Sequence, residues 1–195
     1  MNIGEFLGGL NVFDLLVFLG LFGAFVLGFA QGSIRRLLGI GSMAFSFLLA
    51  ANLKDPIGGF LAANWTQWPS EYSVMIGFLT VFVAAVVAFT LVIQGTYRST
   101  PLFARYRFVD EILGGLLGVF QAGMLLVFVT IILDSFFLFR GIPAQDNELL
   151  FLRGFWETLD ASGTGALLHG TVIPGFLAIF GFFVPGSIRV LYAGS

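Results

Sequence analysis

The stretch RYRFVDEILGGLLGVFQAGMLLVFVTIILDSFFLF, residues 105–139, decides the fold that this sequence predicts. It begins with charged side chains, and from Ile112 to Leu133 it contains none. An apolar helix of that length can cross the hydrocarbon core of a bilayer with room to tilt. We therefore predict a membrane-spanning helix that is closed by Asp134.

A stripe of small residues runs along this predicted helix. Gly114, Gly118 and Ala122 recur at intervals of four, which places them on one helical face, and Gln121 lies beside them. Lipid gives apolar helices no hydrophobic reason to associate, so membrane helices pack where small residues let their backbones approach closely. We expect the stripe to pack against another helix, either the first or the second span.

The composition places the whole chain in a membrane. Of its 195 residues, 58% are hydrophobic and 10% are charged, whereas a soluble domain has about a quarter charged residues. Nine basic against eleven acidic residues give no excess of positive charge, so no nucleic-acid partner is implied. Cysteine is absent, which excludes disulfides, thiol catalysis and Cys-ligated metals. We predict an all-α polytopic membrane protein with the lipid bilayer as its first partner.

Three further apolar runs precede the opening stretch. The first, residues 12–30, follows a terminus without the positive charge of a cleavable signal peptide, so we interpret it as a retained helix. It ends in a glycine-rich turn with Gly28, Gly32, Arg35 and Arg36. The second run, residues 37–53, is slightly short, and it can span if it begins near Ile34 with the arginines reaching the headgroups.

The third span is predicted at residues 72–93, between two loops. Residues 54–71 contain Pro56, Gly58, Gly59 and Pro69, which favour a loop, and tryptophans that suit a membrane interface. Residues 94–111 form the next predicted loop. With the opening stretch, the number of predicted spans is four, in a core of residues 1–139.

The charges of the loops predict the orientation of these spans. The turn after the first span carries two arginines, and the loop after the third carries Arg98, Arg105 and Arg107. The loop between them has one lysine, offset by two acidic residues. Positively charged loops stay in the cytoplasm. We therefore expect the basic turns to be cytoplasmic and both ends of the core to face outward.

Residues 140–195 form a predicted outward-facing tail. Residues 149–160 read as an amphipathic interfacial helix, with Phe151, Phe155 and Trp156 on its apolar side. Residues 173–184 are apolar but only about half as long as a span. We interpret them as a re-entrant or interfacial segment, which becomes a fifth span only if it continues through Tyr192.

Several residues and motifs, taken in order along the chain, resemble the pattern of a known family. They are Asp14, Gly28, Gly32, Arg35 and Arg36, followed by Asp110, Leu113, Gly114, Gly118, Gly123 and Leu133-Asp134-Ser135. Over residues 11–139 the chain resembles the colicin V production protein (CvpA) family of bacterial inner-membrane proteins. It departs at Glu111, where the family often has a basic residue. The resemblance implies a role in colicin V production or export and in envelope function, with no assigned reaction and no cofactor.

The acidic residues are the candidates for chemistry. A carboxylate in hydrocarbon is expensive and is usually explained by a partner or a proton pathway, which makes Asp14 and Asp134 candidate functional residues. Both can instead serve as a cap or a partner of a helix dipole near the interface. Asp110 and Glu111 precede the fourth span, where they favour the helix dipole or bind a partner.

Catalytic and metal sites are not predicted. His169 is the only histidine and has no cysteine beside it, so a metal site is not expected. A triad of Asp160, Ser162 and His169 would need a rigid scaffold and a nucleophile turn, which the sequence does not indicate. The glycine stripes lack the Lys-Ser/Thr ending of a phosphate loop.

Three functions stay open at this point. The first is a non-enzymatic membrane protein that supports colicin or toxin production, secretion and envelope homeostasis by assembling with protein partners or with itself. The second is a small transporter or channel with Asp14, Gln121 or Asp134 in its path. The third is an accessory subunit of a larger membrane complex.

Overall fold

The computed structural model describes residues 11–66, 68–96, 107–138, 150–184 and 186–192, and nearly all of them lie in helices. The core helices are α2 (Val12–Gln31), α3 (Ser33–Asn64), α4 (Ser70–Thr96) and α5 (Arg107–Phe137). The tail follows with α6 (Leu150–Asp160), α7 (Gly163–Leu167), a π-helical turn (Leu168–Val172), α8 (Ile173–Phe180), a 3-10 turn (Gly181–Phe183) and α9 (Gly186–Tyr192). The prediction of an all-α chain is confirmed for these residues, which contain no strand.

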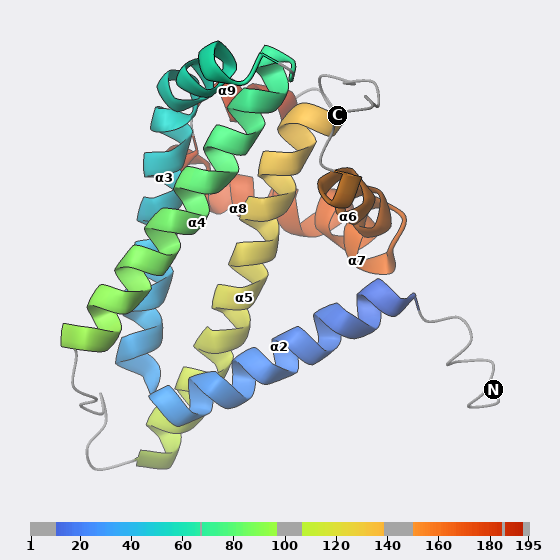
Figure 1. Ribbon diagram of the computed structural model, residues 1–195. Helices are drawn as coiled ribbons and strands as arrows, with labels where there is room; N and C mark the ends of the chain where they lie inside the picture. The colour runs from blue at the N-terminus through green and yellow to red at the C-terminus, as the bar shows by residue number, and fades with distance from the viewer. Residues whose placement is uncertain (1–10, 67, 97–106, 139–149, 185, 193–195) are drawn as a thin grey trace, which may run out of the picture.

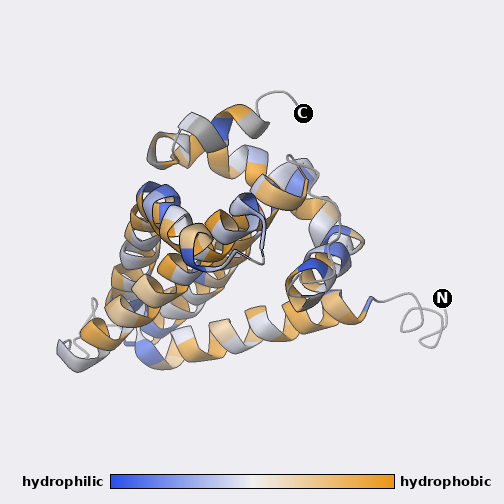
Figure 2. Ribbon diagram, turned by 45° about the horizontal axis from the view of Figure 1, so that its top comes forward, coloured by the Kyte–Doolittle hydropathy of each residue, from blue (hydrophilic) through white to orange (hydrophobic). Residues whose placement is uncertain are grey.

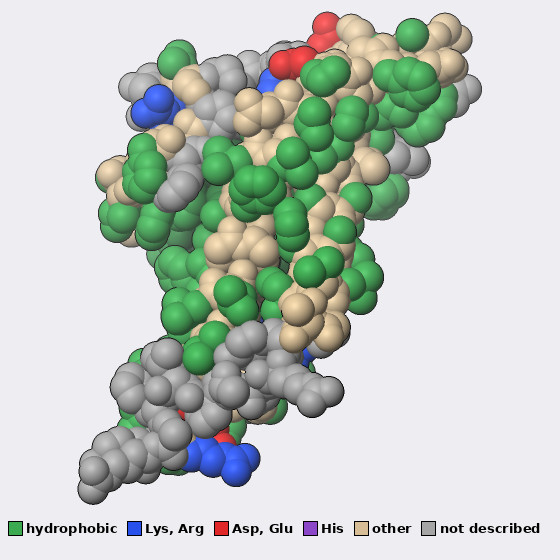
Figure 3. Space-filling model, turned by 90° about the vertical axis from the view of Figure 1, so that its left-hand side faces the viewer, with side chains coloured by type: hydrophobic (Ala, Val, Ile, Leu, Met, Phe, Trp, Pro, Cys, Tyr) green, Lys and Arg blue, Asp and Glu red, His purple; other side chains and the backbone are tan. Residues whose placement is uncertain are grey.

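Helices α3, α4 and α5 stand side by side (Figure 1). Helix α2 packs against one end of α5 and from there slopes away from the bundle. Five helical segments of the described chain are long and apolar enough to cross a membrane: α2, α3, Ser70–Ile93, α5 and the continuous helix Gly163–Phe180. On the face drawn in Figure 3, hydrophobic side chains cover the middle and charged side chains lie near the two ends. This distribution fits a bundle that crosses a bilayer.

Phenylalanines fill the centre of the three-helix bundle. The rings of Phe47 on α3 and Phe128 on α5 stack with centroids 4.2 Å apart and planes 10° apart. Phe82 on α4 meets both of them edge to face. Because each ring is 1–2% exposed, α3, α4 and α5 share one buried core.

The prediction of a loop over residues 54–71 is wrong, because α3 continues to Asn64 and α4 begins at Ser70. Pro56 lies inside α3, where a proline removes one backbone hydrogen bond without necessarily ending the helix. A Cβ atom on Gly58 would lie 2.5 Å from the Cα atom of Val74. Gly58 therefore serves close packing of α3 against α4 and does not form a turn.

The predicted tight turn between the first two spans is reduced to one residue. Gly32 has φ 78°, a left-handed conformation that favours glycine, and its N–H donates to the carbonyl oxygen of Gly28. Helix α3 therefore begins at Ser33, and Arg35 and Arg36 belong to its first turns. The two helices do not form a packed hairpin, since α2 lies mainly against α5.

Helix α5 begins earlier than predicted, at Arg107, so Asp110 and Glu111 lie in its first turns and not before it. Glu111 accepts a 2.9 Å bond from Arg107 one turn away. Arg98 and Arg105 lie outside the described residues, as do residues 1–10 and 139–149.

The small-residue stripe of α5 lies against α2. A Cβ atom on Gly114 would be 2.5 Å from the carbonyl oxygen of Gly28 and 2.8 Å from the carbonyl carbon of Gly32. A Cβ atom on Gly118 would clash with the carbonyl oxygen of Ala24. Backbone packs against backbone along this contact, which we call the glycine seam. It consists of Ala24 and Gly28 of α2, Gly32 directly after α2, and Gly114 and Gly118 of α5.

The tail enters the bundle and returns to the same end. His169 contacts Asp134 near the end of α5, and the ring of Phe176 then lies 5.5 Å from that of Phe128. Phe128 is six residues before Asp134, about 9 Å further into the bundle. Tyr192 then contacts Asp134 again. A path that starts and ends beside one residue has the geometry of a re-entrant segment.

The helix of this path is longer than the sequence predicted. Instead of a short segment over residues 173–184, a continuous helix covers Gly163–Phe180. Pro174 lies inside this continuous helix, directly after the π-helical turn, and its missing N–H removes one backbone hydrogen bond without ending the helix.

We predict that Gly118→Leu separates α2 from α5, because four side-chain carbons would replace a backbone contact. Overpacking of this kind destabilises by about 1–3 kcal/mol or more. Gly123→Leu is the matched control, since a Cβ atom at Gly123 on the same helix meets nothing within 4 Å. Folded yield and unfolding in mild detergent measure the effect. Equal stability of the two variants would contradict the seam.

Candidate functional site

Asp134 is the most deeply buried charged residue of the described chain, with 0% of its surface exposed. It lies three residues before the end of α5, on the side that the tail covers. An ionised carboxylate without partners is strongly disfavoured in such a place. Its partners therefore decide what the site is.

Three tail elements donate hydrogen bonds to this carboxylate. The Trp156 indole of α6 donates to Oδ1 at 2.9 Å. Nε2 of His169, in the π-helical turn, lies 2.8 Å from Oδ2, and the Tyr192 hydroxyl of α9 donates to Oδ2 at 2.7 Å. We call Asp134 with these three side chains the Asp134 junction.

Three side chains converge on one carboxylate at the Asp134 junction. Hydrogen bonds to charged groups contribute about 1.5–3 kcal/mol each, and they are shorter and stronger than neutral ones. Burial, followed by the negative charge of Asp134, raises the pKa of the Tyr192 phenol above its ordinary value. Tyr192 therefore keeps its proton and remains a donor. The junction fixes α6, the π-helical turn and α9 to the end of α5.

Asp14 makes a second link between core and tail. Its Oδ1 accepts from the backbone N–H of Thr164 at 2.8 Å and from the Thr164 hydroxyl at 2.6 Å. Its Oδ2 accepts from the N–H of Gly163 at 3.1 Å. A carboxylate at a helix N-terminus satisfies free N–H groups and complements the dipole. Asp14 therefore caps α7, whereas the sequence placed the capping alternative at its own helix.

Asp110 closes the opposite end of the bundle. It is 5% exposed, and Ser33 at the start of α3 donates to its Oδ1 at 2.5 Å. A Cβ atom on Gly32 would lie 2.7 Å from its Oδ2. The carboxylate therefore joins the turn after α2 to the first turn of α5.

Arg36 turns inward from the same turn. Its Nη1 donates to Oε1 of Gln121 on α5 at 3.1 Å, and its Nε atom is buried without a hydrogen-bond partner. A Cβ atom on Gly39 would lie 2.7 Å from Nε2 of Gln121, so this glycine makes room for the amide. The side chain of Arg36 thus contacts α5, where the sequence analysis had it reaching the headgroups.

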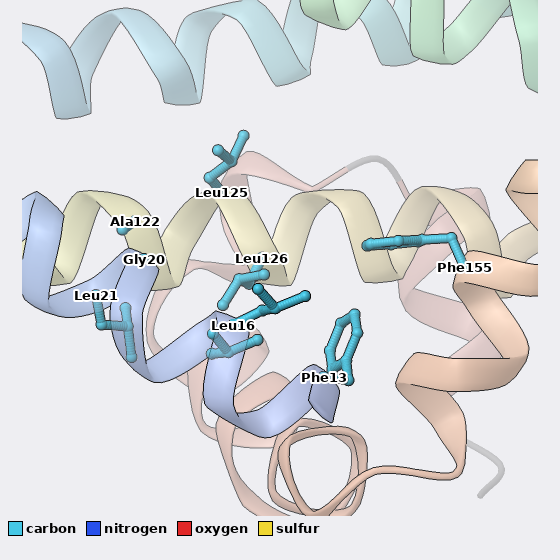
Figure 4. Close-up of a pocket in the computed structure, with 9 residues that line it drawn as sticks. Phe13, Leu16, Gly20, Leu21, Ala122, Leu125, Leu126 and Phe155 are labelled. Carbon is cyan, nitrogen blue, oxygen red and sulfur yellow. The ribbon is translucent and has the colours of Figure 1, made fainter. Parts of the chain in front are cut away.

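An apolar crevice lies between the first half of α2 and the middle of α5. Its volume is about 370 Å³, and Figure 4 shows side chains of α2, α5 and α6 around it. Phe13 and Phe155 close one end, with their rings 5.5 Å apart and edge to face. A second apolar cavity of about 210 Å³ lies between α3, α5 and α8. Neither cavity has Asp14 or Asp134 in its lining.

The comparison with protein families decides what kind of chain this is. The family model described as colicin V production protein matches residues 13–157. The chain belongs to the colicin V production protein family. Among curated proteins and among solved structures, no match was found.

The family match covers only part of the Asp134 junction. Asp14, Asp134 and Trp156 lie within the matched residues, whereas His169 and Tyr192 lie beyond them. In this colicin V production family member, the core and the first tail helix therefore carry the family pattern. The remainder of the junction belongs to residues 158–195, which the family model does not match.

Both carboxylates were predicted from the sequence as candidate residues, but most of the groups that donate hydrogen bonds to them were not. Thr164, Trp156 and Tyr192 were not recognised as site residues, because nothing local distinguishes them from other polar groups of the tail. His169 had one usable signal, as the only histidine of the chain. Among the described residues, no group of three or more His, Asp or Glu side chains is placed to hold a metal ion.

We predict that Asp134→Asn releases the tail from the core. An amide can accept at one oxygen only, so at least one buried donor of the junction loses its partner, at about 1–3 kcal/mol each. Asp55→Asn is the control, because the side chain of Asp55 is 72% exposed and forms its ion pair with the neighbouring Lys54, far from the junction in sequence. Denaturant unfolding in detergent, followed by tryptophan fluorescence, compares the two. A control-like Asp134→Asn would contradict the role of the junction.

Proposed function

We propose that this colicin V production family member is a non-enzymatic membrane assembly protein. It supports colicin or toxin production, or secretion, and envelope homeostasis by binding partner proteins in the bilayer. The observation that carries the proposal is the Asp134 junction, which holds α6, the π-helical turn and α9 as a fixed surface on the end of the bundle. A fixed surface is suited to recognition because little ordering remains to be done on binding.

The use of the two carboxylates favours assembly over transport. Asp14 and Asp134 both accept hydrogen bonds from the tail, and the two apolar cavities do not reach them. A transporter or channel would use such groups in a polar path. Their roles here are structural, so we place the transporter alternative second.

Apolar side chains on the tail supply a surface for a partner. Phe151 is 68% exposed, Ile179 66% and Val190 72%. Phe151 belongs to the predicted apolar side of α6. It is exposed, whereas Leu152 and Leu159 of the same helix are buried. Exposed apolar groups of this size are covered by lipid or by another protein.

A substitution experiment tests this surface without removing the tail. Because Ile173 of the tail is fully buried in the core cluster, truncation would also uncover the bundle. We expect Phe151→Ala with Val190→Ala to lose proteins that co-purify with the parent in mild detergent. Phe18→Ala is the control, since Phe18 is 65% exposed on α2, away from the tail. Partners retained equally by all three chains would contradict the proposal.

The proposed orientation in the bacterial inner membrane follows from charge. The basic turn after α2 and the start of α5 meet at one end of the bundle, where Asp110 contacts Ser33. Arg35, Arg36 and Arg107 therefore gather at that end. The positive-inside rule favours a cytoplasmic location for it, and an outward location for the tail.

Single cysteines test this orientation in a chain that has none of its own. Thr96, at the end of α4, is exposed at the basic end, and Gly59 is exposed near the end of α3 at the other. In intact cells we predict that Gly59→Cys reacts with a membrane-impermeant maleimide and that Thr96→Cys reacts only after lysis. The reverse pattern would mean that the basic end faces outward.

A further inference from the structure

His169 stands between two carboxylates that come from different helices. Its Nε2 atom lies 2.8 Å from Oδ2 of Asp134 on α5, and its Nδ1 atom lies 3.6 Å from Oδ1 of Asp160 at the end of α6. The three side chains are 25%, 0% and 48% exposed, respectively for His169, Asp134 and Asp160. The carboxylate on the Nε2 side of the imidazole is therefore buried, whereas the carboxylate on the Nδ1 side is about half exposed.

A neutral imidazole cannot donate to both carboxylates. It carries one N–H and one lone pair, so donation from Nε2 to Asp134 leaves the lone pair of Nδ1 pointing at Asp160. The separation of 3.6 Å is too long for a hydrogen bond, and two electron-rich atoms face each other across it. A protonated imidazole donates from both nitrogens, which would turn this gap into a charged hydrogen bond.

We propose that His169 is a proton-operated latch between the tail and the core. When the ring is protonated, it joins α5, α6 and the π-helical turn through Asp134 and Asp160. When it is neutral, the link to Asp160 is lost and only the bonds to Asp134 remain. The latch goes beyond the proposed function, because it is a property of the chain alone.

The other groups around the ring do not reverse this behaviour. Tyr192 donates to the same Oδ2 atom of Asp134 and keeps its proton, and Trp156 has no titratable proton in this range. Neither group changes its protonation in this range, so the pH dependence of the docking comes from the ring of His169. The remaining charged groups of the described tail helices are Arg153, Glu157 and Arg189, of which Arg153 lies over the Phe137 ring at 4.8 Å.

The position of the ring in the helix suits a switch. His169 lies in the π-helical turn Leu168–Val172. Such turns are rare in proteins, and those that occur are often found at functional sites. Histidine is the side chain whose charge changes between pH 5 and 8. A protonated ring can donate to both carboxylates, whereas a neutral ring can donate to only one. The tail is therefore expected to dock more firmly in acid and to loosen as the pH rises.

The first test follows the ring itself. Because His169 is the only histidine, a chain labelled with ¹³C at histidine Cε1 and purified without a histidine tag gives one resonance. We expect its titration in detergent to move to lower pH in Asp160→Asn and to stay unchanged in Asp55→Asn. Identical titrations in the parent and in Asp160→Asn would overturn the proposal.

The second test follows the docking of the tail. In a background of Trp65→Phe and Trp68→Phe, Trp156 is the only tryptophan and reports on the Asp134 junction. We expect acrylamide to quench it about twice as strongly at pH 8 as at pH 6. The difference should vanish in His169→Gln and in Asp160→Asn. An unchanged pH dependence in Asp160→Asn, which keeps every bond to Asp134, would overturn the latch, as would a flat profile in the parent.

Discussion

A buried carboxylate has to be satisfied, and in this protein that requirement determines how the tail folds. Asp134 has no exposed surface, and Trp156, His169 and Tyr192, which contact its carboxylate, all lie beyond the last core helix. Each donor must arrive from a separate element, which forces the tail to bend back twice. Asp14 is not buried, and it meets the free N–H groups of α7 as a helix cap instead.

The core helices are held together in two different ways. Aromatic rings fill the space between α3, α4 and α5, where Phe47 and Phe128 stack. Helix α2 instead touches α5 by backbone contact at the glycine seam, and hydrophobic residues follow the rest of its length (Figure 2). Away from the seam the two helices diverge and leave the apolar crevice. Helix α2 is therefore the core element with the fewest buried side chains.

The length of apolar runs and the spacing of small residues predicted the spans and the packing face of Gly114 and Gly118, because both depend on periodicity. The extent of α3 was missed, since Gly58 reads as a loop residue until Val74 lies against it. The donors of Asp134 were missed for a similar reason. They are 22, 35 and 58 residues away in sequence, and no local pattern connects them.

The cap that Asp14 places on α7 joins positions separated by 150 residues. At ribosomal rates of about 5–20 residues per second, roughly 8–30 s pass between the synthesis of these two positions. During that interval the start of α2 lacks its contact with α7, and the glycine seam can form only after α5 has been made. The helices between α2 and α7 are therefore synthesised before the start of α2 gains this anchor.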